Sequence, residues 1–279
     1  TTRDTLSLHD ALPIWIFIHI GLIITSLFFL LPLLWILRTS LISKVEAYQI
    51  PPNWSAALTL ENYANVLNGN SYLQYFFNSF WVSIITTVVA VVFGAMASYW
   101  IARFAVKVSA IKVSVLLIQM VPPVVLIIPF SMIISQLKLS DTWASLIVTY
   151  LSFTLPYVMW MLVGFFEEVP KDLDEAAKMD GCNSLQTYFK IVLPLAMPGI
   201  MATSVYSFIV CWNEFMYALN LTGLKARTVP VAIANMDTSQ GVQIAELCAS
   251  VLIGIIPIII LSLFIKKYLV SGLTFGSVK

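Results

Sequence analysis

Apolar residues occur along this chain in long uninterrupted runs rather than in the short alternating patterns of a water-soluble domain. A helix that crosses the hydrocarbon core of a bilayer needs about 20 consecutive, mostly apolar residues. Six segments meet this length with few or no charges inside them, at about 14–37, 78–102, 111–135, 142–166, 198–221 and 247–268. The pattern therefore predicts an all-α integral membrane protein with six transmembrane helices.

Prolines in the third and fourth expected helices indicate irregular backbone there. Pro122, Pro123 and Pro129 fall in the third segment, and Pro156 falls in the fourth. Each proline removes a backbone donor, and the carbonyls it leaves unpaired are tolerated in a membrane where neighbours or a cavity satisfy them. We therefore expect these helices to kink or unwind there, either as a gating element or as a structural irregularity.

Composition agrees with a lipid environment and limits the possible functions. Of 279 residues, 59% are hydrophobic and 10% are charged, and the mean hydropathy is +0.91, whereas a soluble domain carries about 25% charged residues. The net charge of +1 gives no field that would attract nucleic acid. Cys182, Cys211 and Cys248 form no CxxC pair, and the two histidines, His9 and His19, lie near the N-terminus. We therefore expect neither a disulfide nor a metal site.

Lysine and arginine residues in the connecting segments indicate the orientation. If the N-terminus is cytoplasmic, ten of these 15 residues lie inside and five outside, as the positive-inside rule requires. Both termini are then cytoplasmic. Residues 1–14 are atypical and are interpreted as a possibly non-native leader, so the membrane domain is expected to span residues 15–279.

The segment from 167 to 197 is the one substantial connection on the cytoplasmic side. Pro170 suits the first turn of a helix, and Gly181 suits the position after its end, where φ is positive. Asn183 and Gln186 then have capping-box spacing. The segment is therefore predicted to form two short amphipathic helices that meet at a glycine. The second helix is expected to carry one apolar stripe of Leu185, Tyr188, Phe189 and Val192.

Two small residues in this segment, Ala176 and Ala177, would let another surface approach the backbone closely. A rigid helix pair between two membrane helices can also transmit force, which favours a docking element for a cytoplasmic partner. The alternative is a solvated helical hairpin without a partner. Glu175 has two interpretations as well, because an acidic residue near a helix start is favoured by the dipole even without a partner.

The residues of this segment resemble the EAA loop of binding-protein-dependent ABC importer permeases, the type I class. The matching positions, all at the expected spacing, are Glu175, Ala176, Ala177, Gly181, Ile191, Leu193 and Pro194. Two further runs, Trp212–Phe215 and Lys266–Gly276, are similar to the carbohydrate branch, which includes the second permease subunit of the maltose importer. The resemblance covers about residues 15–279.

This resemblance implies a type I permease fold in which the 167–197 loop acts as the coupling helix and its seven matching residues dock with an ATP-binding subunit. The implied function is alternating-access transport of a sugar or sugar-like solute, delivered by an extracytoplasmic binding protein, across a bacterial or archaeal cytoplasmic membrane. The implied partners are an ATP-binding subunit dimer, a second and different permease chain, and the binding protein.

The chain itself is not expected to be an enzyme or to bind a cofactor. None of its 11 glycines is followed by lysine, so it has no GxxxxGK[ST] phosphate loop. ATP and Mg²⁺ would then be bound by the partner subunit.

Polar residues inside the expected helices are candidates for the substrate path. Glu214 is the one acidic residue of the fifth segment, and a charge at mid-membrane costs about 2.5–3.5 kcal/mol unless it faces protein or water. We assign the path to Asn213, because an amide both donates to and accepts from a sugar hydroxyl, and expect Glu214 to secure the helix bundle. Asn78 and Gln119 are further candidates.

Two other classes of protein were compared with this interpretation. An ion-coupled secondary transporter or channel needs no docking loop and is expected to carry more charge within the membrane. A membrane enzyme needs a cluster of titratable groups near one interface, which the sequence does not contain. The identity of the solute is not predicted by the sequence.

Overall fold

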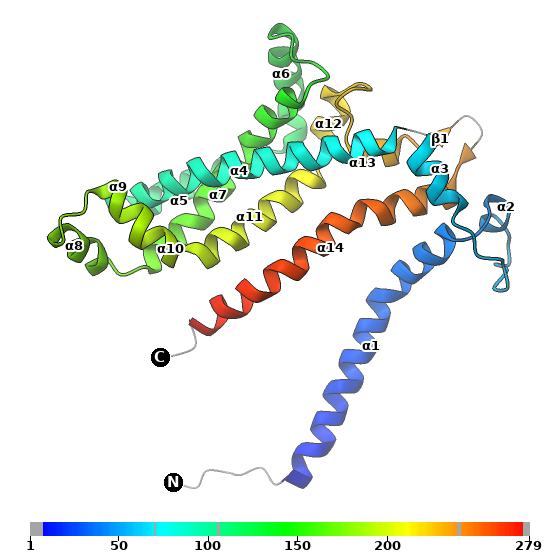
Figure 1. Cartoon of the computed structure of the whole chain (residues 1–279), viewed down its shortest axis with the longest axis horizontal. Coiled ribbons are helices and arrows are strands. Elements are labelled where there is room, and N and C mark those ends of the chain that lie inside the picture. The colour runs from blue at the N-terminus through cyan, green and yellow to red at the C-terminus, as the bar shows by residue number, and fades with distance from the viewer. Residues whose placement is uncertain (1–7, 70, 105–106, 239–240, 276–279) are drawn as a thin grey trace. The chain divides into compact units, whose positions relative to one another are not determined.

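The computed structural model describes residues 8–69, 71–104, 107–238 and 241–275. Most of them are helical, as the apolar pattern predicts (Figure 1). The chain divides into two compact units, one from residues 1–70 and 236–253 and the other from residues 71–235 and 254–279. Residues 1–7 of the expected leader lie outside the described residues, and α1 begins at Leu8.

Polar contacts between distant segments hold the first unit together. Asn62 donates its side-chain amide to the carbonyl oxygens of Ser40 and Ile42, at 2.9 and 2.8 Å. Lys44 Nζ lies 2.7 Å from Glu246 Oε1. These contacts connect elements that are far apart in sequence: α1 (Leu8–Ser40), α2 (Lys44–Ala47), α3 (Glu61–Gly69) and the start of α14 (Ile244–Phe275), which follows the antiparallel pair β1 (Asp237–Thr238) and β2 (Gly241–Val242).

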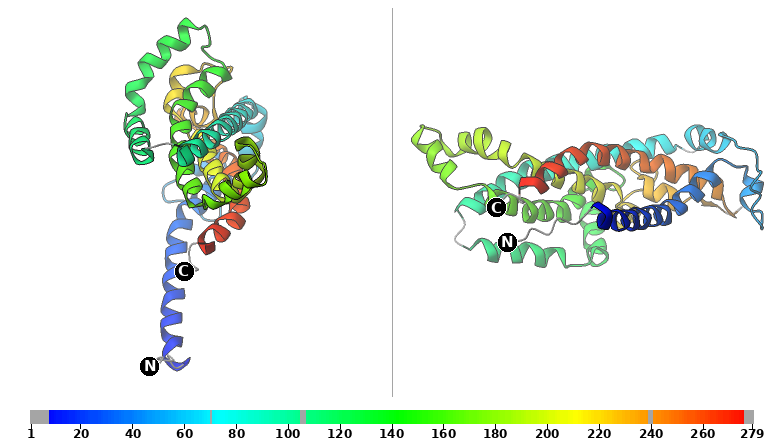
Figure 2. Two further views of the ribbon diagram at one scale, coloured as in Figure 1. Left: turned by 90° about the vertical axis from the view of Figure 1, so that its left-hand side faces the viewer. Right: turned by 90° about the horizontal axis from the view of Figure 1, so that it is seen from below.

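The second unit contains the remaining helices, and α4, α7 and α11 pack side by side at its centre (Figures 1 and 2). Its elements are α4 (Tyr72–Phe104), α5 (Val108–Gln119), α6 (Pro123–Gln136), α7 (Trp143–Glu168), α8 (Asp172–Met179), α9 (Ser184–Thr187), the π-helix η1 (Tyr188–Val192), α10 (Leu193–Leu195), α11 (Met197–Trp212), α12 (Met216–Leu221), α13 (Val229–Ala234) and the rest of α14.

Glycines allow these three helices to approach closely. A Cβ added to Gly94 of α4 would lie 2.6 Å from Val158 Cγ1 of α7, and one added to Gly199 of α11 would lie 2.3 Å from the Phe165 ring. Because apolar surface gains little by leaving lipid, helices in a membrane associate through such close van der Waals packing.

Four of the six expected membrane helices are single helices in the part of the chain that the structure describes. They are α1, α4, α7 and α14, with candidate spans at Trp15–Ser40, Tyr72–Phe104, Trp143–Glu168 and Ile244–Phe264. The third is the bent pair of α5 and α6, which meet at 80°, and the fifth coincides in part with Met197–Trp212, which meets Ser184–Leu195 of the preceding loop at 76°. The chain thus has six apolar spans if each bent pair counts as one.

Pro122 and Pro123 account for the first of these bends. Pro122 has extended backbone at the N-cap of α6, and Pro123 is the first residue of α6, because proline disfavours helical geometry in the residue before it. The prediction of an unwound segment is confirmed here, whereas Pro129 and Pro156 lie inside α6 and α7 without ending them.

The expected continuous fifth helix over 198–221 is wrong at its C-terminal end. Helix α11 stops at Trp212, and α12 begins at Met216. The physical reason is a polar pair: Asn213 occupies the C-cap of α11, and the Glu214 carboxylate accepts hydrogen bonds from the N–H groups of Tyr217 and Ala218, at 2.8 and 3.0 Å. A side chain that binds these free N–H groups stabilises a new helix start.

Candidate docking loop and substrate path

The 167–197 loop begins as the sequence predicts. Helix α8 ends at Met179, and Gly181 follows with φ of +83°, which favours glycine. Asn183 and Gln186 form the predicted reciprocal capping box, with N–H to side-chain oxygen distances of 2.9 and 2.8 Å. The turn between α8 and α9 is therefore fixed by local chemistry alone.

A buried ion pair anchors this loop to the membrane helices. Arg103, at the end of α4, places Nε 2.8 Å from Asp174 Oδ2 of α8, and the two side chains are only 4% and 10% exposed. Its other two nitrogens donate to the carbonyl oxygens of Phe166 and Val169, at 2.9 and 3.0 Å. Tyr99 donates its hydroxyl to Asp174 Oδ1 at 2.8 Å. All three guanidinium nitrogens thus connect α4, the end of α7 and α8.

The second half of the loop is held by apolar packing. Tyr188 and Val192 are buried in a core cluster that also contains Tyr99 and Phe166, and the Tyr99 and Tyr188 ring centroids are 5.1 Å apart. Leu185 and Phe189, by contrast, are exposed.

The predicted single apolar stripe is therefore wrong. The helix changes to π geometry over Tyr188–Val192, and its i→i+5 pairing rotates successive side chains away from the positions that a regular α-helix gives them. Within this segment Tyr188 and Val192 are buried while Phe189 is exposed, and Leu185, in the preceding α9, is exposed as well.

The seven residues that resemble the docking motif do not form one surface. Ala177 is 2% exposed and packs within its own chain, while Glu175 and Ala176 are exposed beside it. The others are Gly181 and Pro194, which are exposed, and Ile191 and Leu193, which are partly buried. Within α8 itself, the accessible part of the motif is thus the face that carries Glu175 and Ala176.

The polar residues proposed for the path have separate surroundings. Asn213 is exposed and donates its amide to the Ile209 carbonyl oxygen of its own helix at 2.9 Å, and Glu214 caps α12. Asn78 is fully engaged, since it donates to the carbonyl oxygens of Lys225 and Arg227 and accepts from the Trp143 indole. Gln119, at the end of α5, lines a cavity.

Sequence reasoning missed the anchoring role of Tyr99, Arg103 and Asp174. Their sequence signal is a lone arginine at the end of an apolar helix and an acid in the first turn of the loop helix. The positive-inside rule already explains the arginine, and the helix dipole already explains the acid. Only the fold shows that the two charges meet.

Comparison with known proteins defines the class. Residues 90–274 match the family described as the binding-protein-dependent transport system inner membrane component, and this chain belongs to that family. It is a multi-pass inner-membrane permease of the ABC transporter type, so it acts in transport and is not an enzyme.

Similar proteins match along most of the chain. A trehalose transport system permease protein of Mycobacterium tuberculosis is 39% identical over 256 residues, which are 90% of this chain and 92% of that protein. A trehalose/maltose transport system permease protein of Thermococcus litoralis is 34% identical, over 95% of this chain and 96% of that protein. A bacterial ABC transporter that imports the acidic polysaccharide alginate has a chain of the same fold, with a TM-score of 0.75 and 20% identity over 95% of this chain and 99% of that one. The fold is therefore that of a type I ABC importer permease.

Proposed function

We propose that this permease carries a sugar or sugar-containing solute, which an extracytoplasmic binding protein delivers, by alternating access across the inner membrane. The relatives named for trehalose and for trehalose/maltose transport support this substrate class. ATP and Mg²⁺ are bound by a pair of partner ATP-binding subunits, and a second, different permease chain completes the path. Both termini and the 167–197 loop face the cytoplasm.

The observation that carries the docking proposal is the rigid attachment of α8. A loop that receives force from a partner must not move independently of the helices that it drives. The Arg103–Asp174 pair, the Tyr99 hydroxyl and the buried Tyr188 ring all fix α8 and its neighbour to α4 and α7. Its outward face is left free, with Ala176 exposed and Met179 88% exposed.

The test is Ala176→Arg in the assembled importer. A long charged side chain on the exposed face should prevent close approach of the ATP-binding subunit and lower ATP-dependent uptake, roughly tenfold for each 1.4 kcal/mol of docking energy lost. Ala177→Arg is less informative, because it would bury a charge within the permease itself. Co-purification of the ATP-binding subunit and uptake of labelled trehalose and maltose are measured together.

The matched control is Ala57→Arg, the same substitution at an exposed alanine of the segment expected on the opposite side of the membrane. It should leave both co-purification and uptake unchanged. Wild-type co-purification and uptake by a correctly inserted Ala176→Arg protein would refute docking at this face.

A further inference from the structure

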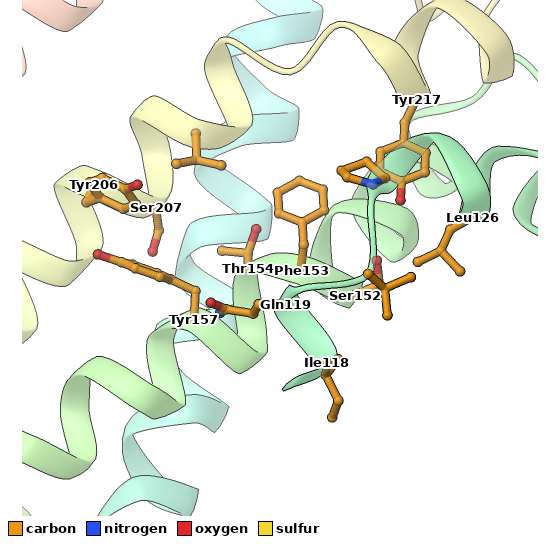
Figure 3. Close-up of a pocket in the computed structure, with 13 residues that line it drawn as sticks. Ile118, Gln119, Leu126, Ser152, Phe153, Thr154, Tyr157, Tyr206, Ser207 and Tyr217 are labelled. Carbon is orange, nitrogen blue, oxygen red and sulfur yellow. The ribbon is translucent and has the colours of Figure 1, made fainter. Parts of the chain in front are cut away.

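A cavity of about 230 Å³ lies within the second unit, beside the break between α5 and α6 (Figure 3). Residues of α7, α11 and α12 complete its wall. Non-helical backbone within a membrane span is tolerated where it lines a cavity, and the bend that Pro122 and Pro123 impose provides that space. The residues labelled in Figure 3 are Ile118, Gln119, Leu126, Ser152, Phe153, Thr154, Tyr157, Tyr206, Ser207 and Tyr217.

Aromatic rings form much of the cavity wall. Tyr157 and Tyr206 stack with their centroids 4.6 Å apart, and Phe153 and Tyr217 are nearly parallel at 6.1 Å. Figure 3 shows the first pair at one end, with Phe153 in the middle and Tyr217 toward the other end. Such rings present flat apolar faces, and the tyrosines add hydroxyl groups.

Two polar atoms in this wall are buried without a hydrogen-bond partner in the described part of the chain. They are Gln119 Nε2 and Ser207 Oγ, and Ser207 is fully buried. An unpaired buried polar group is costly, so native proteins usually satisfy it with protein, water or ligand. Ser204, one turn earlier on α11, instead donates to the Ile200 carbonyl oxygen of its own helix.

We propose that this cavity is a sugar-binding subsite formed by this permease chain alone. A pyranose ring matches it chemically, because its C–H faces pack on aromatic rings while its hydroxyls both donate and accept hydrogen bonds. The Gln119 amide and the Ser207 hydroxyl bind those hydroxyls. The cavity is smaller than the roughly 300–1,000 Å³ of pockets for drug-sized ligands, so it takes one ring of a larger solute.

A lipid or detergent acyl chain fits the site less well, because it would leave both polar atoms unpaired. The inference rests on the proposed function, since it requires the transported solute to be a sugar. It also moves the substrate path from Asn213, whose amide is already bonded within its own helix, to Gln119.

The experiment measures uptake by the reconstituted importer over a range of trehalose and maltose concentrations. Gln119→Leu keeps the side-chain volume but removes the amide, and Ser207→Ala removes the hydroxyl. Each should lower uptake about three- to tenfold even at concentrations that saturate the binding protein, the loss expected for one hydrogen bond. ATP hydrolysis by the assembled complex without solute should stay unchanged.

The matched controls are Gln136→Leu, at the exposed end of α6, and Ser204→Ala on α11. Both should transport like the wild type. Wild-type uptake by both Gln119→Leu and Ser207→Ala would overturn the subsite while leaving the proposed function intact. If the wild-type importer takes up neither disaccharide, the result counts against the proposed substrate class and the subsite together.

Discussion

At the scale of single residues, Asp141 shows how one carboxylate can organise a loop. Asp141 precedes α7 with φ of +57°, and its N–H donates to the Leu221 carbonyl oxygen at 3.0 Å. Its Oδ1 accepts from the N–H groups of Gly223 and Ala226, and Oδ2 accepts from that of Lys225. One side chain thus joins the segment before α7 to the segment after α12.

This environment changes the acidity of Asp141. Partial burial opposes the charged form, but the hydrogen bonds from the backbone N–H groups of Ala226, Lys225 and Gly223 outweigh it and hold the pKa of Asp141 below its ordinary value. A lowered pKa in the folded state means that the charge contributes stability above the ordinary pKa of about 3.9, and that this contribution is lost as pH falls through the lowered value.

We therefore predict that Asp141→Asn lowers the thermal unfolding midpoint at pH 7 and has a smaller effect at about pH 3.5. Asparagine tolerates positive φ, so the substitution tests the charge rather than backbone strain. The loss at pH 7 should be about 1 kcal/mol, because solvent screens much of the interaction. Asp180→Asn, at an exposed carboxylate, is the control. An effect of Asp141→Asn that does not change with pH would contradict this account.

At the scale of elements, the loop helix α8 is a part of the membrane bundle rather than an independent hairpin. Its eight residues give it only a short packing surface of its own, yet Asp174 and Ala177 are buried. Its position depends on the ion pair with Arg103 at the end of α4. A buried ion pair adds little net stability over apolar replacements, but removing one partner leaves an uncompensated charge.

This asymmetry leads to a prediction for the pair. Asp174→Leu alone leaves the Arg103 guanidinium buried without its carboxylate and should release α8, whereas Arg103→Met combined with Asp174→Leu should restore its attachment. The measurement is the rate of trypsin cleavage after Lys171 and Lys178, both exposed on the loop. We expect an increase on the order of tenfold or more for the single variant, and less for the double variant.

The control for general unfolding is the thermal unfolding midpoint of each variant. It should stay close to the wild-type value, because α4, α7 and α11 pack mainly against one another. If the double variant is cleaved at least as fast as Asp174→Leu, the ion pair does not fix the loop in the way proposed.

At the scale of the whole molecule, much of the fold could be predicted from sequence because a bilayer imposes simple rules. Length and hydropathy alone predict where α1, α4, α7 and α14 lie, since a segment that crosses the bilayer must form all its backbone hydrogen bonds internally. Proline chemistry predicts the break before Pro123, and glycine chemistry predicts the turn at Gly181. These are local effects, and the structure confirms them.

The remaining features depend on long-range contacts. The sequence predicts one continuous helix through Asn213 and Glu214, because the N–H groups that Glu214 binds belong to a second helix whose start has no other sequence signal. The cavity is formed by residues from α5, α6, α7, α11 and α12. No local sequence pattern shows that the Gln119 amide nitrogen lacks a hydrogen-bond partner, whereas the Asn78 side chain has several. The role of the docking residues remains a prediction. The fold adds that Ala176 is exposed and Ala177 is buried.

The orientation of the chain is the last prediction, and native cysteine chemistry can test it. Cys182 lies in the loop after α8 and is partly exposed, whereas Cys211 and Cys248 are buried. If both termini and this loop are cytoplasmic, a membrane-impermeant maleimide should label Cys182 in inverted vesicles but not in intact spheroplasts. A Cys182→Ser, Ala57→Cys variant should show the opposite pattern, because residue 57 belongs to the segment expected outside. The physical basis is the excess of lysine and arginine on the loop side, ten residues against five. Labelling of Cys182 from outside, in spheroplasts shown to be sealed, would reverse the proposed orientation and place the docking loop on the wrong side for an ATP-binding partner.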